Sequence, residues 1–160
     1  MVKFVLDADG AIKLTKANIL TALTGFARCI ITEQVYAEIL KGKEKMYEDA
    51  FIIEDLVVKK KIALTKIKPM LENKDLGIGE LSTLALFQKT NADAIISDDR
   101  KFISLLESKG IPFIIPIDII TILAIKKILS SKEALNALEN IKLIVREDNY
   151  FKAKKLLEEK

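Results

Sequence analysis

The stretch AIISDDRKF, Ala94–Phe102, joins a short apolar run to two adjacent aspartates and two cations. The apolar run predicts a buried strand, and the residues from Arg100 onward have the spacing of a helix. A single aspartate at such a junction commonly caps the helix, because its carboxylate accepts a hydrogen bond from a free backbone N–H group. A helix needs only one cap, so the pair Asp98–Asp99 requires a second explanation.

The same succession of apolar run and helix recurs along the chain. Strands are expected at Val2–Leu6, Arg28–Ile31, Ala94–Ile96 and Pro112–Ile115. Helices are expected at Gly10–Leu23, Thr32–Leu40, Lys43–Ile53, Gly79–Lys89 and Arg100–Lys109, and again after Pro116. The stretch Asp55–Asp75 is expected to hold a short strand or helix followed by a loop. Strands that are apolar throughout and alternate with helices are typical of a parallel sheet covered on both faces, so the predicted fold class is α/β.

The composition is that of an ordinary globular protein, with 160 residues of which 50% are hydrophobic and 31% charged. One domain covering residues 1–160 is expected, with a helical C-terminal extension from about residue 117. The net charge of +3 permits a nucleic-acid partner without requiring one. The chain opens directly into a predicted strand rather than a signal peptide, which favours a cytoplasmic protein.

Two further features exclude other classes of protein. The apolar stretch Ile111–Leu129 is interrupted by two prolines, an aspartate and two lysines, so it predicts a buried strand and helix rather than a membrane span. Cys29 is the only cysteine and lies in an apolar run, which favours a buried free thiol in a reducing compartment. With a single cysteine and no histidine, a zinc site is not expected.

Acidic residues follow two of the predicted strands. Asp7 and Asp9 come after the first strand, and Asp98 and Asp99 come after Ala94–Ile96. The carboxyl ends of parallel strands meet at one edge of a sheet, which is where open α/β sheets bind their ligands. Both acidic pairs are therefore expected at the same edge.

Two glutamates border the buried sides of predicted helices. Glu38 is next to Ile39, and Glu80 lies on the same side of its helix as Leu84 and Phe87. Burying a lone carboxylate costs several kcal/mol, so such an acid requires a partner. Simpler roles exist for each acid taken alone: an aspartate can cap the next helix, Glu80 can gain from the helix dipole, and Glu38 can be a solvated residue.

Taken jointly, the acids favour a metal site. Carboxylates that converge on one edge repel each other unless cations lie among them, and a site made of oxygen ligands alone selects Mg²⁺ or Mn²⁺. Mg²⁺ held by acids most often serves phosphoryl chemistry, in which it activates water and stabilises charge on phosphate oxygens.

The chain resembles the PIN-domain family in four motifs that occur in the family's order and spacing. The motifs are LDADGAIKL (Leu6–Leu14), ITEQVYAEIL (Ile31–Leu40), LGIGELSTLALF (Leu76–Phe87) and ISDDRKF (Ile96–Phe102). The resemblance covers nearly the whole chain up to the helical tail, and is closer to an archaeal and bacterial subgroup than to the family's average. It implies a three-layer α/β/α sandwich with a central, mostly parallel sheet of four to five strands, and a Mg²⁺- or Mn²⁺-dependent ribonuclease.

The resemblance also implies roles for individual residues and partners. The implied catalytic acids are Asp7, Glu38, Glu80, Asp98 and Asp99. The implied metal ligands among them are Asp7, Glu80, and Asp98 or Asp99, with both aspartates of the pair kept as candidates. Many relatives are VapC-type toxins that a cognate antitoxin holds inactive, and many form dimers, so RNA, an antitoxin protein and a second copy of the chain are the implied partners.

Residues around these acids are candidates for supporting roles. Asp9 stands where relatives usually have Ser, Thr or Asn, so it adds charge to the site. Thr32 and Ser97 are candidates for hydrogen bonds to the acids, although a helix cap is the more common role for a residue placed like Thr32. Arg100 and Lys101 adjoin the acids and are candidates for binding RNA phosphates. Other cations with the same candidate role are Lys13, Lys16 and Lys59–Lys61.

Two alternatives use the same residues differently. The opening LDADG also resembles haloacid-dehalogenase-type phosphatases, in which Asp7 would attack phosphate and Asp9 would transfer a proton. That alternative leaves Glu38 and Glu80 without a role, and Ala11 stands where such phosphatases usually have Thr. The second alternative is an inactive scaffold or binding domain whose acids are structural.

Overall fold

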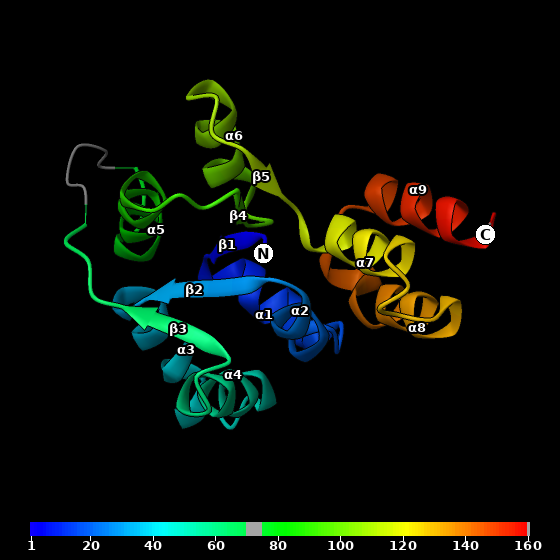
Figure 1. Cartoon of the computed structure of the whole chain (residues 1–160), viewed down its shortest axis with the longest axis horizontal. Coiled ribbons are helices and arrows are strands. Elements are labelled where there is room, and N and C mark those ends of the chain that lie inside the picture. The colour runs from blue at the N-terminus through cyan, green and yellow to red at the C-terminus, as the bar shows by residue number, and fades with distance from the viewer. Residues whose placement is uncertain (70–74, 160) are drawn as a thin grey trace.

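The computed structural model describes residues 1–69 and 75–159, and its centre is a five-stranded sheet (Figure 1). The strands are β1 (Lys3–Leu6), β2 (Arg28–Thr32), β3 (Ile62–Thr65), β4 (Ala94–Ile96) and β5 (Phe113–Ile114). They lie in the order β3-β2-β1-β4-β5, and each neighbouring pair in this described part of the chain is parallel. The predicted α/β class and parallel sheet are confirmed.

Helices cover both faces of the sheet, which gives three layers (Figure 1). They are α1 (Ala8–Lys16), α2 (Leu20–Phe26), α3 (Glu33–Glu44), α4 (Glu48–Val58), α5 (Ile78–Lys89), α6 (Arg100–Ser108), α7 (Pro116–Ile125), α8 (Ser131–Ile141) and α9 (Glu147–Glu158), with a short 3-10 helix η1 (Lys142–Ile144). Val5 and Ile95 pack in a core with Phe102 of α6, whereas Leu6 and Ile96 belong to the core on the opposite face. Alternate strand residues thus enter different cores, which explains why the strands are apolar throughout.

The boundaries predicted for two helices are wrong, because a residue with left-handed backbone ends a helix in each segment. Asn18 has a φ of 62°, so the segment Gly10–Leu23 forms α1 and α2 rather than one helix. Met46 has a φ of 59°, so Lys43–Ile53 is divided between α3 and α4. The stretch Asp55–Asp75 contains the end of α4 and the strand β3, and its residues 70–74 lie outside the described part of the chain.

The chain after β5 is helical, as predicted, and its helices α7, α8 and α9 pack on each other beside α1 (Figure 1). Tyr150 of α9 is buried, and its hydroxyl donates a hydrogen bond to Glu139 of α8. The segment between η1 and α9 returns toward the carboxyl edge of the sheet, where Arg146 and Asp98 line one cleft.

Two features of the structure concern membrane spans and the single cysteine. No helix in the described residues reaches the length and hydropathy of a membrane-crossing segment. Cys29 is a buried free cysteine of β2, as predicted, and burial raises the pKa of its thiol to about 12. A thiol with so high a pKa is protonated at neutral pH, as is usual for a cysteine whose role is packing.

Candidate active site

Asp7 lies at the carboxyl end of β1, where it caps α1. Its Oδ1 accepts a hydrogen bond from the N–H of Gly10 at 2.7 Å, and its Oδ2 accepts one from the hydroxyl of Ser97. Only 3% of the residue is exposed. Burial is the main cause that raises the pKa of Asp7 to about 7; the two hydrogen bonds oppose the rise, and the charges of Asp9 and Glu80 add to it. This carboxyl therefore changes its charge near neutral pH.

Gly10 allows α1 to approach β4 closely enough for this arrangement. A Cβ atom at position 10 would lie 2.4 Å from the carbonyl oxygen of Ile96 and 3.0 Å from Oδ1 of Asp7. The Asp7 N–H also donates to the same Ile96 carbonyl at 3.2 Å. A glycine at this position is therefore required by the closeness of α1 and β4, not by a turn.

The two aspartates that follow β4 have different partners. Asp98 forms an ion pair with Lys13 of α1, whose Nζ lies 2.8 Å from Oδ2. Burial raises the pKa of Asp98, and Lys13 opposes that rise. Asp99 instead caps α6, since its Oδ1 accepts a hydrogen bond from the N–H of Phe102 at 2.9 Å. One member of the pair is thus neutralised by a lysine, while the other stays at a helix N-terminus.

Glu80, in the first turn of α5, connects the acids electrostatically. Burial is the largest cause that raises its pKa, and the charges of Asp99 and Glu38 raise it further, whereas Lys101 lowers it. The charge of Glu80 in turn raises the pKa of Asp7. Acids from four separate segments therefore interact at one edge of the sheet.

Gly79 brings α5 and α3 together beside these acids. A Cβ atom at position 79 would lie 2.7 Å from Oε2 of Glu38, so the glycine leaves room for this carboxylate in its present position between the two helices. Thr32 caps α3 by accepting a hydrogen bond from the N–H of Val35 at 3.0 Å, and its hydroxyl is hydrogen-bonded to Ser82 of α5 at 2.7 Å. Thr32 therefore stabilises the junction of α3 and α5, and contacts a serine rather than an acid.

The donor atoms of this site are carboxylate oxygens, which fit a hard divalent cation such as Mg²⁺ or Mn²⁺. Such a cation would relieve the repulsion by which neighbouring acids raise the pKa of Asp7 and of Glu80. Oδ2 of Asp9 is buried without a hydrogen-bond partner among the described residues, although Nζ of Lys13 lies 3.4 Å away. Residues 1–69 and 75–159 hold no group of three His, Cys, Asp or Glu side chains already placed to enclose one metal ion.

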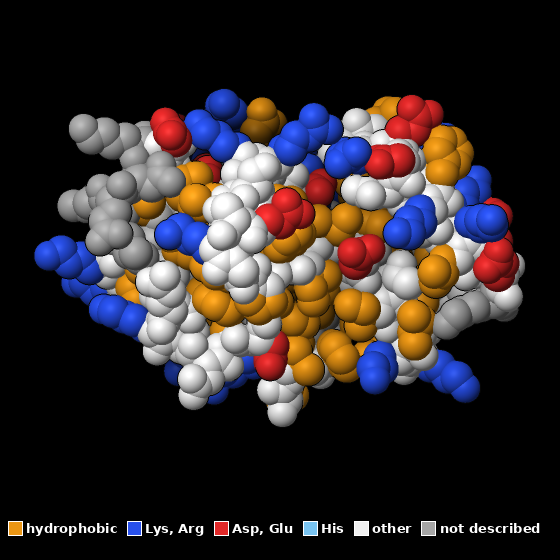
Figure 2. All heavy atoms as spheres, turned by 90° about the horizontal axis from the view of Figure 1, so that it is seen from above, with side chains coloured by type: hydrophobic (Ala, Val, Ile, Leu, Met, Phe, Trp, Pro, Cys, Tyr) orange, Lys and Arg blue, Asp and Glu red, His pale blue; other side chains and the backbone are white. Residues whose placement is uncertain are grey.

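Cations adjoin the acids, and one of them was missed by the sequence analysis. Arg100 and Lys13 line a cleft of about 530 Å³ together with Asp98. Arg146 lines the same cleft, and its charge lowers the pKa of Asp98. Sequence spacing gives no signal for Arg146, because only the packing of the C-terminal helices brings it to this edge. Figure 2 shows basic and acidic side chains interspersed on the face seen there, so attraction of a polyanion depends on local groups such as these.

The raised pKa of Asp7 predicts how stability depends on pH when EDTA removes divalent cations. The pKa of Asp7 is higher in the folded chain than its ordinary value of 3.8, so the folded state binds the proton more tightly than the unfolded state does. The contribution of this protonated carboxyl to the free energy of unfolding is complete below about pH 4 and is lost as the pH rises to about 7. The largest slope from one such group is about 1.4 kcal/mol per pH unit. Urea unfolding of Asp7→Asn between pH 4 and 8 is expected to show a shallower decline than the original protein. Parallel curves would contradict the assignment.

Comparisons with known proteins bear on the family to which the chain belongs. A family model described as "DUF3368: PIN domain" matches residues 3–159. No curated protein matches the chain. Among solved structures, the chain is similar to a PilT N-terminus domain protein from the hyperthermophilic archaeon Sulfolobus solfataricus P2, at 13% identity and a TM-score of 0.49, over 73% of this chain and 89% of that one. The match over nearly the full length favours the predicted family over the phosphatase alternative: the chain belongs to the PIN-domain family, whose members are generally metal-dependent nucleases.

Proposed function

We propose that the protein is a metal-dependent endoribonuclease that hydrolyses RNA phosphodiester bonds at the carboxyl edge of the sheet. The observation that carries the proposal is the meeting of Asp7, Glu38, Glu80 and Asp99, which come from four separate segments and interact through Glu80. Membership of the PIN-domain family supports nuclease chemistry, and the choice of RNA over DNA is part of the proposal.

Each acid has a role in this proposal. Asp7, Glu80 and Asp99 hold Mg²⁺ or Mn²⁺, and Glu38 completes the acidic group or orients the attacking water. When bound, the cation lowers the pKa of water and stabilises negative charge on the phosphate oxygens. Ser97 holds the Asp7 carboxylate in position through its hydrogen bond. Cleavage would leave a 3′-hydroxyl group on the upstream product.

The different partners of the two aspartates predict different effects of their removal. Asp99→Asn keeps an oxygen that can cap α6 but removes the charge near Glu80. The single-turnover rate of RNA cleavage is expected to fall at least about 100-fold, because loss of a residue that only supports a metal ligand already costs 10–100-fold. Asp98→Asn removes the charge that pairs with Lys13 but keeps an oxygen that can accept its hydrogen bond, and a fall of about 5-fold is expected because positioning is disturbed while the ligands remain. Single-turnover cleavage rates of the two variants test this assignment, which a larger loss in Asp98→Asn would contradict.

The proposed function is tested by incubating the protein with single-stranded and structured RNAs in Mn²⁺, Mg²⁺ or EDTA. Cleavage that requires the cation, and that is weaker on DNA of the same sequence, supports a ribonuclease. Cleavage of DNA and RNA at equal rates would keep nuclease activity but contradict the choice of RNA. Turnover of p-nitrophenyl phosphate without RNA cleavage would favour the phosphatase alternative, and inactivity in both assays would favour a scaffold.

A toxin role with a partner antitoxin, a homodimer and a cytoplasmic location stay predictions made from the sequence. Copurification of the chain with an inhibitory protein, and its mass in solution, are the measurements that bear on the first two.

A further inference from the structure

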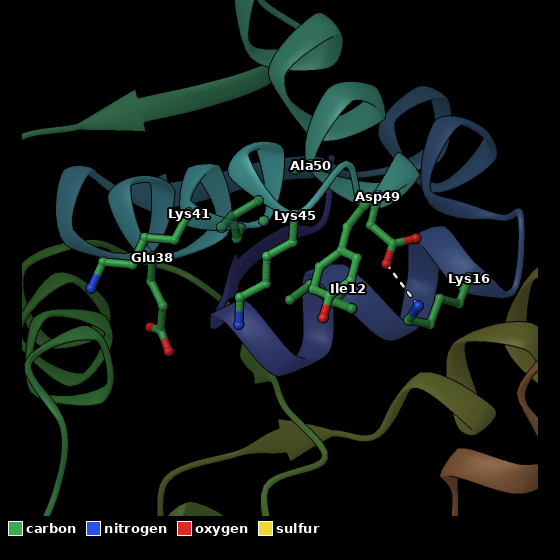
Figure 3. Close-up of a pocket in the computed structure, with 10 residues that line it drawn as sticks. Ile12, Lys16, Glu38, Lys41, Lys45, Asp49 and Ala50 are labelled. Carbon is green, nitrogen blue, oxygen red and sulfur yellow. Dashed lines mark ion pairs between the residues drawn. The ribbon is translucent and has the colours of Figure 1, made fainter.

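A cleft of about 490 Å³ begins at Glu38 and runs between α1, α3 and the start of α4 (Figure 3). Glu38 and Lys41 also line a second cleft, of about 360 Å³, which contains Glu80. The two clefts therefore share a wall beside the proposed catalytic acids. A strand of RNA whose cleaved bond lies at Glu80 could continue past Glu38 into the larger cleft.

Cationic side chains follow Glu38 along α3. Lys41 and Lys45 come three and seven residues after Glu38, a spacing that places all three on one side of a helix. At a rise of about 1.5 Å per residue, Lys45 is about 10 Å along the helix axis from Glu38. In Figure 3, the side chains of Glu38 and Lys45 extend from α3 to the same side, toward α1. The cleft thus offers an amino group two helical turns from the acid.

Tyr47 is fixed at this cleft by the turn that ends α3. Its N–H donates to the carbonyl of Gly42 at 2.9 Å, and Met46 adopts the left-handed conformation that this cap requires. A Cβ atom at position 42 would lie 3.2 Å from Cδ2 of the tyrosine ring, so the ring rests against the glycine. Even so, 55% of Tyr47 is exposed, and Nζ of Lys45 lies 6.0 Å from the ring centroid.

The remainder of the cleft has apolar side chains at its floor and an ion pair at the end away from Glu38. Ile12 and Ala50 line it, and Lys16 forms an ion pair with Asp49 at 2.9 Å (Figure 3). An exposed aromatic ring beside cations is the combination by which proteins bind single strands, because bases stack on the ring while amines contact phosphates. Bases inside a duplex are already stacked and cannot use such a ring.

We propose that this cleft binds the single-stranded RNA next to the cleaved bond, with a base stacked on Tyr47 and a phosphate held by Lys45. This inference rests on the proposed ribonuclease function and names its substrate as unpaired RNA. Tyr47 and Lys45 act on binding rather than on the reacting atoms, so their loss raises Kd and KM while kcat changes little.

The test measures binding of a fluorescein-labelled single-stranded RNA by anisotropy in EDTA, and KM and kcat with Mn²⁺. Tyr47→Ala is expected to weaken binding and raise KM about 10-fold, within the range for loss of one stacked base. Tyr47→Phe keeps the ring and is expected to bind within about 2-fold of the original protein, because stacking needs no hydroxyl. Lys45→Ala is expected to lower the slope of log Kd against log salt concentration by about 0.7, the value for one phosphate contact on a single strand.

Matched controls separate the cleft from the rest of the surface. Phe151 of α9 is an aromatic residue outside the cleft, and its exposed fraction of 53% is similar to the 55% of Tyr47. Lys132 of α8 is an exposed lysine. Phe151→Ala and Lys132→Ala are expected to leave binding and KM unchanged. Thermal melting of every variant confirms that it is folded, and Tyr47→Phe keeps the test valid if Tyr47→Ala is unstable. Duplex RNA of the same sequence is expected to bind the original protein and Tyr47→Ala equally.

The outcomes distinguish this inference from the proposed function. If the original protein cleaves RNA and Tyr47→Ala and Lys45→Ala behave as the controls do, the cleft is not the binding site and only the inference fails. The same conclusion follows if Tyr47→Phe is as defective as Tyr47→Ala. If the two variants weaken RNA binding but the original protein cleaves nothing in Mn²⁺, the ribonuclease function fails and the RNA site stands.

Discussion

Asp7→Asn is expected to lower metal-dependent RNA cleavage by at least about 100-fold. Mutating a residue that only supports a metal ligand already lowers activity or metal affinity 10–100-fold, and Asp7 is itself a proposed ligand. The substitution removes the buried charge while an amide oxygen can still accept the hydrogen bond from Gly10. In EDTA above pH 7, the Asp7→Asn variant is expected to be more stable to unfolding than the original protein, because folding no longer buries a charged carboxylate. Activity and stability should therefore change in opposite directions.

Asp93→Asn is the matched control for this substitution. Asp93 is exposed, and its carboxylate accepts a hydrogen bond from the N–H of Lys3 at 2.8 Å, near the amino ends of β1 and β4. Asparagine can keep that hydrogen bond, so cleavage is expected to stay within about 2-fold of the original, as for most surface changes. Cleavage rates from a single-turnover assay and urea unfolding of both variants provide the measurement. Full activity in Asp7→Asn would contradict its role.

Gly10→Ala is expected to destabilise the fold by about 3 kcal/mol, the upper end for overpacking a closely packed site. The added methyl group would lie 2.4 Å from the carbonyl oxygen of Ile96, and backbone on a central strand cannot move aside as a flexible side chain could. It would also lie 3.0 Å from Oδ1 of Asp7, so cleavage should fall in whatever fraction remains folded. Urea unfolding at fixed pH measures the first effect, and activity per folded molecule measures the second.

Gly25→Ala supplies a control of opposite sign. Gly25 lies in α2, is exposed, and a Cβ there would meet no described atom within 4 Å apart from its chain neighbours and the nearby backbone of its own helix. Alanine is favoured over glycine in a helix by about 0.5–1 kcal/mol, so this variant is expected to be slightly more stable than the original. If Gly10→Ala proves slightly more stable than the original, as Gly25→Ala is expected to be, helix propensity rather than the contact with Ile96 decides the effect at position 10.

Much of the fold could be predicted from the chain because most of its strands are apolar runs that alternate with helices. The runs that form β1, β2, β4 and β5 were predicted to within a residue or two at each end. The strand β3 was uncertain, since its sequence IALT is short and follows a run of lysines. Its place next to β2 is set by pairing between distant segments, which spacing along the chain does not encode.

The turns were harder to predict because their left-handed residues carry no glycine signal. Asn18, Met46, Lys60 and Lys127 all have positive φ angles. Glycine is the residue that usually marks the end of a helix, so a methionine at the end of α3 indicates continuation instead. Because the turn at Met46 was not predicted, Tyr47 was not identified as a candidate site residue. Its position against Gly42 depends on that turn.

The candidate site was predictable to the extent that acids follow strands. The positions of Asp7 and Asp99 follow from a parallel sheet, and Ser97 was singled out as a hydrogen-bond partner of the acids, which it is for Asp7. The difference between Asp98 and Asp99 could not be predicted, because it depends on Lys13 reaching across from α1. Arg146 required the packing of the whole C-terminal segment, which no local pattern specifies.

The central claim is that the acids at the carboxyl edge support metal-dependent hydrolysis of RNA. It is tested most directly by the chemistry of the ends produced from a labelled RNA, with Mn²⁺ and with EDTA. Hydrolysis by an activated water predicts a 3′-hydroxyl on one product and a 5′-phosphate on the other, formed only with the cation and lost in Asp7→Asn. Products ending in a 2′,3′-cyclic phosphate, formed equally in EDTA and by Asp7→Asn, would contradict the claim.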